Sequence, residues 1–213
     1  MKKQQSTTTK VNFILDESGS MEMVRDATIS GFNEYINSLK KKTKGEILFN
    51  LVTFDTESTQ VYENEPLKKV KLTKENYQPD GMTALYDAVV NTIEKVAKHD
   101  DEKTANLVVI MTDGEENSSR EHNQTCVRDL VSKLEKRGNW TFVFLGANQD
   151  SWATTASLGL AAGNTINWDN SNVKGVMVSF RGLAGSTVAY CASVGTGNLS
   201  TSNFYQGRKD LSK

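Results

Sequence analysis

Short apolar runs alternate along the chain with segments in which apolar residues recur every three or four positions. The clearest runs are Val11–Leu15, Ile47–Phe54, Leu107–Met111 and Trp140–Leu145. Runs of this kind are typical of strands buried on both faces of a parallel sheet. Helical spacing separates them, at 21–41, 85–96, 127–134, 151–158 and 173–184. The alternation predicts an α/β fold, with a doubly wound, mostly parallel sheet and helices on both of its faces.

Two weaker strands are expected beside these runs. Thr59–Tyr62 follows the second run closely and is predicted to pair with it antiparallel through the turn at 55–58, and Thr165–Trp168 is a short strand late in the chain. The 213 residues suit about one domain, which we expect to span residues 9–191. Residues 1–8 are expected to form a flexible N-terminus, and residues 192–213, where periodicity ends, a flexible tail.

Composition excludes several classes of function. Lys and Arg number 25 and Asp and Glu 26, and this net charge of −1 argues against a basic nucleic-acid-binding domain. The two His, and the two Cys at 126 and 191 without a CxxC spacing, fit neither a zinc site nor a disulfide framework. No apolar stretch approaches the roughly 18 residues of a membrane span, and no signal-peptide core follows the basic start. We therefore expect a cytoplasmic protein that binds neither nucleic acid nor a membrane.

Oxygen-bearing side chains gather in three loops that follow strands or precede helices. These loops are Asp16–Ser20, Asp80–Thr83 and Thr112–Asn117. In a doubly wound sheet, ligands bind outside the carboxyl ends of the strands, where the strand order reverses. If the strands at 11–15 and 107–111 are neighbours there, five side chains converge on one crevice: Asp16, Ser18, Ser20, Thr83 and Asp113.

Two carboxylates and three hydroxyls, with no His or Cys, form a hard-oxygen donor set. Such a set suits Mg²⁺, with Mn²⁺ or Ca²⁺ as alternatives, and does not suit zinc. The acidic body of the chain fits cation binding, because residues 45–180 carry 20 acidic and 13 basic residues. A purely structural alternative has Ser18, Ser20 or Thr83 capping helices. In that alternative Asp113 forms an Asx-turn with Gly114.

The Asp-x-Ser-x-Ser run at residues 16–20, Thr83 and Asp113 together resemble the metal-ion-dependent adhesion site of von Willebrand factor type A domains. The resemblance covers roughly residues 9–190. It implies a six-stranded sheet with one antiparallel edge strand, here Thr59–Tyr62. It also implies that the three hydroxyls approach the metal directly, while Asp16 and Asp113 act mostly through metal-bound water. As a small type A domain, the chain resembles bacterial and phage proteins that work inside the cell.

The expected function is that of a metal-dependent protein-binding module without enzymatic activity, whose divalent cation captures an Asp or Glu of a partner protein. One alternative is a scaffold whose metal only stabilises the loops. Another is a Mg²⁺-dependent phosphohydrolase of the haloacid-dehalogenase type, which also places an Asp after the first strand. That mechanism needs a second carboxylate two residues later, and Ser18 occupies this position, so the acid/base group is missing.

Overall fold

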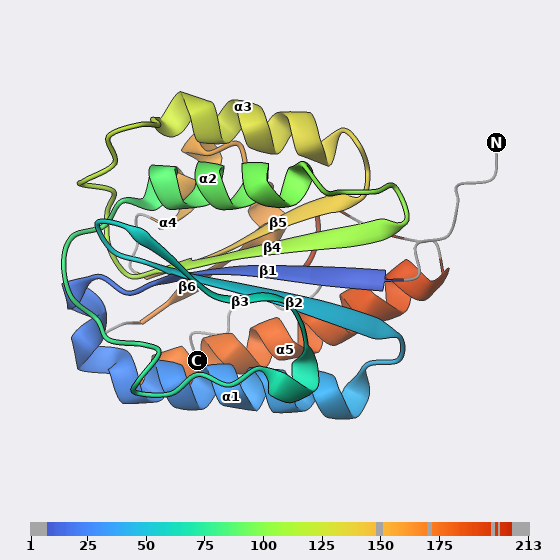
Figure 1. The fold of residues 1–213 in the computed structure, drawn as a ribbon, viewed down its shortest axis with the longest axis horizontal. Coiled ribbons are helices and arrows are strands. Elements are labelled where there is room, and N and C mark those ends of the chain that lie inside the picture. Colours follow the sequence, from blue (N-terminus) through green and yellow to red (C-terminus); the bar gives the residue numbers. More distant parts are fainter. Residues whose placement is uncertain (1–7, 148–150, 170–171, 197–198, 200, 206–213) are drawn as a thin grey trace.

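A computed structural model describes residues 8–147, 151–169, 172–196, 199 and 201–205. These residues form one six-stranded sheet in the order β3-β2-β1-β4-β5-β6 (Figure 1). The strands are β1 Thr8–Asp16, β2 Glu46–Phe54, β3 Ser58–Pro66, β4 Thr104–Thr112, β5 Trp140–Ala147 and β6 Thr165–Trp168. All neighbouring pairs are parallel except β2 with β3, which is the predicted antiparallel edge. The predicted fold class is confirmed.

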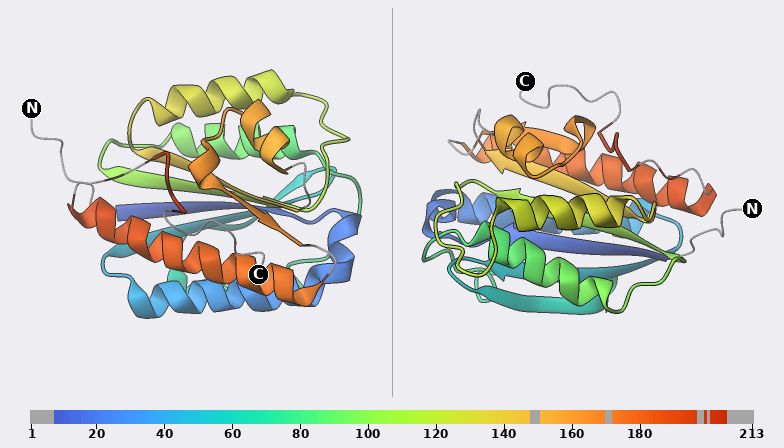
Figure 2. Two further views of the ribbon diagram at one scale, coloured as in Figure 1. Left: turned by 180° about the vertical axis from the view of Figure 1, so that it is seen from behind. Right: turned by 90° about the horizontal axis from the view of Figure 1, so that it is seen from above.

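Helices cover both faces of the sheet, as Figures 1 and 2 show. The α-helices are α1 Arg25–Lys42, α2 Leu85–Ala97, α3 Gln124–Glu135, α4 Ser151–Ser157 and α5 Val173–Thr196. Helices α1 and α5 lie on one face, and α2 and α3 on the other. The described residues also form three short 3₁₀ helices: η1 Gly19–Val24, η2 Leu67–Lys69 and η3 Ala162–Asn164. Within the described residues, no helix has both the length and the apolar composition that crossing a membrane requires.

The central strand β1 supplies apolar side chains to two separate cores. Phe13 packs in the core beneath α1 and α5, whereas Ile14 belongs to the core beneath α2 and α3. This division follows from the pleat, because successive strand side chains point to opposite faces. Phe13 stacks with Phe49 and Phe180 at ring-centroid distances of 6.3 Å each, which ties β2 and α5 to the centre of the sheet.

The order of the strands reverses at β1. Strand β1 pairs with β2 on one side and with β4 on the other, and Leu15 lies opposite Met111. The chain leaves β1 toward α1 and leaves β4 toward α3, so the two connections depart to opposite faces of the sheet (Figure 1). The carboxyl ends of β1 and β4 therefore border a crevice of the kind in which α/β proteins bind ligands.

The C-terminal part differs from the expected flexible tail. Helix α5 continues to Thr196, and Phe204 and Tyr205 are buried in the core beneath α1 and α5. The Phe204 backbone N–H donates to Oδ1 of Asn164 at 2.9 Å, which holds this segment against η3. The boundary expected at residue 191 thus falls inside a helix, while residues 1–7 and 206–213 lie outside the described part of the chain.

Candidate metal centre

Asp16, the last residue of β1, is fully buried and its carboxylate is held from two sides. Its Oδ1 accepts a hydrogen bond of 2.7 Å from the Ser18 backbone N–H. Its Oδ2 accepts one of 2.5 Å from the hydroxyl of Thr112, at the end of β4. Both bonds restrain the carboxylate orientation, so the crevice between β1 and β4 contains a pre-positioned anionic group.

Burial dominates the electrostatics of this carboxylate. The pKa of Asp16 is raised from 3.8 to about 6, chiefly by removal from water and to a smaller extent by the nearby charge of Asp113. The hydrogen bonds from Ser18 and Thr112 act in the opposite direction but do not cancel the effect of burial. A buried carboxylate with a raised pKa gains from a cation beside it, because a positive charge favours the ionised form.

The two serines connect Asp16 with Asp113. The Ser18 and Ser20 hydroxyl oxygens lie 3.1 Å apart, and the Ser20 hydroxyl donates to Oδ1 of Asp113 at 2.6 Å. Ser18 is buried, whereas Ser20 is exposed and Asp113 partly so. The chain of oxygens therefore runs from the interior end of β1 to the surface of the loop that follows β4.

Thr83 reaches the same place from the loop before α2. A Cβ built on Gly114 would lie 3.1 Å from the Thr83 hydroxyl oxygen and 3.7 Å from that of Ser20. All three loops therefore meet at Gly114, where a side chain would crowd the hydroxyls. Asn117 fixes Thr83 in this position, since its Oδ1 accepts from the Thr83 N–H at 2.9 Å and its own N–H donates to the Thr83 carbonyl at 3.0 Å.

Backbone hydrogen bonds tie the first and second loops together. The Gly19 N–H donates to the Gly81 carbonyl at 3.2 Å, and the Asp80 N–H donates to the Glu17 carbonyl at 2.9 Å. Gly81 has a φ of 71°, a left-handed conformation that glycine adopts without strain. The buried Tyr77 hydroxyl adds a bond of 2.8 Å to the Asp16 carbonyl. The first two loops are thus joined to each other by hydrogen bonds.

The structure brings together all five side chains that the sequence singled out. Their contacts also bear on the alternative in which the hydroxyls cap helices and Asp113 forms an Asx-turn. Ser18 is the N-cap residue of η1, and Ala84, not Thr83, precedes α2; neither helix start has a side-chain cap hydrogen bond. The Gly114 N–H donates to the Thr112 hydroxyl, and the Asp113 carboxylate accepts from Ser20. The polar side chains therefore face one another across the crevice.

Sequence reasoning missed three supporting residues, Thr112, Asn117 and Tyr77. Thr112 directly precedes Asp113 and is the last residue of β4, which pairs with β1. Its position at the end of a strand next to β1 could have indicated a contact with Asp16. Asn117 and Tyr77 act across 34 and 61 residues of sequence, respectively, so no local pattern reveals their contacts. Among the described residues, no group of three or more His, Cys, Asp or Glu forms a metal cluster. A divalent cation would therefore depend on the hydroxyls, and the mixed oxygen donor set fits a hard cation.

The family model of the von Willebrand factor type A domain matches residues 11–177. No curated protein matches the chain. Among solved structures, the PilB minor pilin from Streptococcus sanguinis is 14% identical over 88% of this chain and 62% of that chain, with a TM-score of 0.62. The proximal thread matrix protein 1 from the mussel byssus has zinc in its metal-ion-dependent adhesion site (MIDAS) motif. It is 15% identical over 89% of this chain and 49% of that chain, with a TM-score of 0.61.

Manganese-loaded TRAP protein from Plasmodium vivax is 21% identical over 83% of this chain and 74% of that chain, with a TM-score of 0.56. The chain spans between about half and two thirds of the length of the first solved structures it matches. At these identities the likeness concerns the fold. The family is shown by the model match, which covers most of the chain and includes most of β1, the whole of β2 to β6 and all three loops. This chain belongs to the family of von Willebrand factor type A domains.

Proposed function

We propose that Asp16, Ser18, Ser20, Thr83 and Asp113 hold a divalent cation, and that the protein uses this site to bind an acidic side chain of a partner protein. The observation that carries the proposal is the convergence of three loops on one crevice, with Ser18 and Ser20 3.1 Å apart and Ser20 2.6 Å from Asp113. Domains of this family are generally non-catalytic binding modules.

Each residue has a distinct part in the proposal. The hydroxyls of Ser18, Ser20 and Thr83 are neutral donors within direct reach of a cation. Both oxygens of Asp16 already accept hydrogen bonds, which suits a carboxylate that acts through a bridging water. Asp113 lies nearer the surface and orients Ser20. Bound there, a divalent cation would supply a Lewis-acidic position for a partner's carboxylate oxygen.

Mg²⁺ is the cation we propose, because hydroxyl and carboxylate oxygens are hard ligands. Mn²⁺ and Ca²⁺ share this preference. The mussel protein holds zinc in its metal-ion-dependent adhesion site, although a hard-oxygen donor set does not favour zinc, and the Plasmodium protein is manganese-loaded. Both support a site that also admits other divalent cations. We also propose a cytoplasmic location, which the free thiols of Cys126 and Cys191 support.

Isothermal titration with MgCl₂ tests the cation site. Wild type is expected to bind Mg²⁺, and Asp16→Ala and Ser18→Ala are expected to lose measurable binding. Asp129→Ala and Ser132→Ala on the exposed side of α3 are matched controls that should bind as wild type does. Absence of Mg²⁺ binding by the folded wild type would refute the proposal.

An affinity purification with and without EDTA tests the binding role. An EDTA-sensitive protein partner, lost in Ser18→Ala and retained in Ser132→Ala, is the expected result. Metal binding without any EDTA-sensitive partner would favour a metal that only stabilises the loops. Metal-dependent turnover of p-nitrophenyl phosphate that Asp16→Asn abolishes would favour the phosphohydrolase instead. In that case the binding proposal would be wrong.

A further inference from the structure

Three large apolar side chains are strongly exposed in the part of the chain that the structure describes, and all three lie at the carboxyl edge of the sheet. They are Met23, Val173 and Met82, with 86%, 60% and 51% of their surface exposed. Met23 lies in η1 together with Ser20, and Met82 lies in the loop that carries Thr83. We propose that Met23 and Met82 form an apolar rim that selects partners whose acidic residue is flanked by apolar side chains. This inference rests on the function proposed above.

The geometry of η1 places Met23 beside the candidate metal centre. A 3₁₀ helix has three residues per turn, so side chains three positions apart lie on the same side. Met21 and Val24 face the core in this way, with 0% and 4% exposure. Ser20 and Met23 are the corresponding pair on the outer side, about 6 Å apart along the axis. Since Ser20 donates to Asp113, Met23 lies one turn from the centre of the site.

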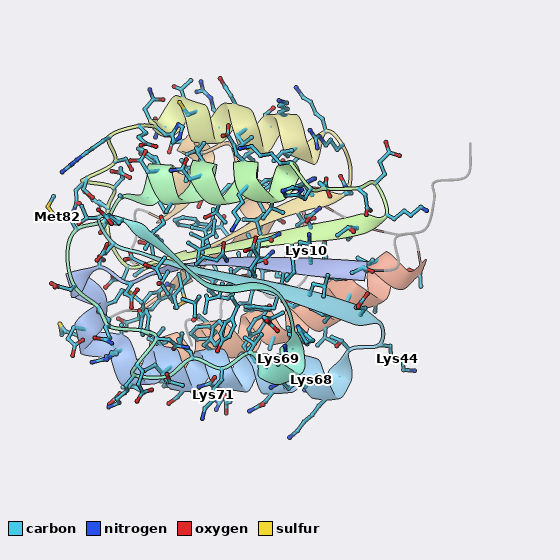
Figure 3. All side chains as sticks on the ribbon, viewed as in Figure 1. Lys10, Lys44, Lys68, Lys69, Lys71 and Met82 are labelled. Atoms are coloured by element: carbon cyan, nitrogen blue, oxygen red, sulfur yellow. The ribbon has the colours of Figure 1, made fainter. Side chains whose placement is uncertain are left out.

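Met82 occupies the equivalent place in the second loop. It directly precedes Thr83, which is buried with 3% exposure, while Met82 projects outward at the tip of the molecule (Figure 3). The Thr56 hydroxyl accepts from the Met82 N–H at 3.2 Å, so the backbone beneath the side chain is held in place. The Met82 loop leads into α2 and the Met23 turn into α1, on opposite faces of the sheet (Figure 1). The two methionines therefore flank the site from both faces.

Charge around the site narrows the class of partner further. Asp80 and Glu115 are exposed in the second and third loops, and Glu22 is exposed in η1, where its carboxylate lies 3.9 Å from the Arg25 guanidinium. Arg25, the nearest cation along the chain, is directed to the Tyr77 and Lys74 carbonyls at 3.1 and 2.8 Å. A run of acidic residues in a partner would therefore meet like charge. The rim fits a segment with one carboxylate and apolar neighbours, which unbranched methionine side chains can accommodate in several shapes.

A phage-displayed peptide library with one fixed Asp and three random residues on each side tests the inference, panned in MgCl₂ and in EDTA. Wild type is expected to enrich large apolar residues beside the Asp, to deplete Asp and Glu, and to do so only in Mg²⁺. The double variant Met23→Gln/Met82→Gln keeps the length of both side chains and makes them polar. It should bind the enriched peptides about tenfold more weakly than wild type does. Val173→Ser is the matched control, since it removes an exposed apolar side chain that lies in α5 and outside the three loops.

Mg²⁺ titration of the same variants separates the rim from the metal centre, because Met23→Gln/Met82→Gln should bind Mg²⁺ as wild type does. Mg²⁺-dependent enrichment without apolar preference, or an apolar preference unchanged in the double variant, would overturn the rim while leaving the proposed function intact. No Mg²⁺-dependent enrichment from any peptide would count against both.

Discussion

Thr112 and Asp16 join the ends of the two central strands, since the Thr112 hydroxyl donates to Oδ2 of Asp16 at 2.5 Å. The same hydroxyl accepts from the Gly114 N–H at 3.1 Å. A single side chain thus orients the buried carboxylate and shapes the loop in which Asp113 lies. The contact explains how a crevice between parallel strands can keep an anionic group in a fixed position.

Thr112→Val, which keeps the shape and removes the hydroxyl, is predicted to destabilise the protein by about 1–3 kcal/mol, because a buried carboxylate oxygen loses its donor. Mg²⁺ affinity should fall together with stability. Thr112→Ser retains the hydroxyl and serves as the control. Urea unfolding and calorimetric titration measure the two effects, and equal behaviour of the Val and Ser variants would contradict this role of the hydroxyl.

The raised pKa of Asp16 predicts a pH-dependent stability of the metal-free protein. Its folded-state pKa of about 6 lies above the ordinary 3.8, so the favourable contribution is present below 3.8 and is lost as the pH rises through 6. The shift corresponds to about 3 kcal/mol. Urea unfolding in EDTA between pH 4 and 7 should show this loss in wild type, and Asp16→Asn should remove this part of the pH dependence.

Mg²⁺ should reverse the trend, because the cation favours the ionised carboxylate. The gain in melting temperature on adding MgCl₂ is therefore expected to be larger at pH 7 than at pH 5. Asp129→Asn, at an exposed position on α3, should retain this difference. A gain that is equal at both pH values would show that proton release from Asp16 is not linked to cation binding.

Gly114 is predicted to be required for the approach of the three loops. An added Cβ would lie 3.1 Å from the Thr83 hydroxyl oxygen, so Gly114→Ala should displace Thr83 by a few tenths of an ångström. We expect at least about tenfold weaker Mg²⁺ binding, since cation sites tolerate little misplacement of their ligands. Gly195→Ala in α5, where an added Cβ meets nothing within 4 Å, is the control. Unchanged Mg²⁺ affinity in Gly114→Ala would argue against a cation at this point.

Much of this architecture was predictable from local pattern. The buried runs at 107–111 and 140–145 became central strands because parallel strands covered on both faces need continuous apolar residues. Asp16 and Asp113 were predictable because each follows such a strand, and parallel strands end at a common edge. Their supporting contacts were not, since Asn117 and Tyr77 reach the site only after distant segments have packed.

The C-terminal region shows why local pattern fails elsewhere. Gly182 and Gly185 lower the helix propensity of the last segment, yet α5 runs unbroken to Thr196. Packing against α1 outweighs propensity here, and both Gly182 and Leu183 are buried. Phe204 follows a stretch without periodicity, yet it is buried, and its backbone N–H donates to Asn164 forty residues earlier. Such tertiary contacts leave no periodic signal in the sequence.

The contact between α1 and α5 supports a final prediction about stability. A Cβ on Gly31 would lie 2.3 Å from Cδ2 of Phe180, closer than any side chain tolerates. Phe180 cannot move away freely, because it is fully buried and stacks with Phe13 at 6.3 Å. Gly31→Ala should therefore destabilise the protein by about 1–3 kcal/mol, although alanine favours a helix more than glycine does.

A double-variant cycle tests this reason directly. Phe180→Leu alone should be destabilising, but Gly31→Ala should cost less when Phe180 is already Leu, since the ring that clashes is gone. Ser30→Ala, at the exposed neighbouring position of α1, should leave stability nearly unchanged. Urea unfolding of the four proteins in the cycle measures the coupling between the two positions. Additive effects of Gly31→Ala and Phe180→Leu would mean that the close approach of the two helices does not determine the choice of glycine.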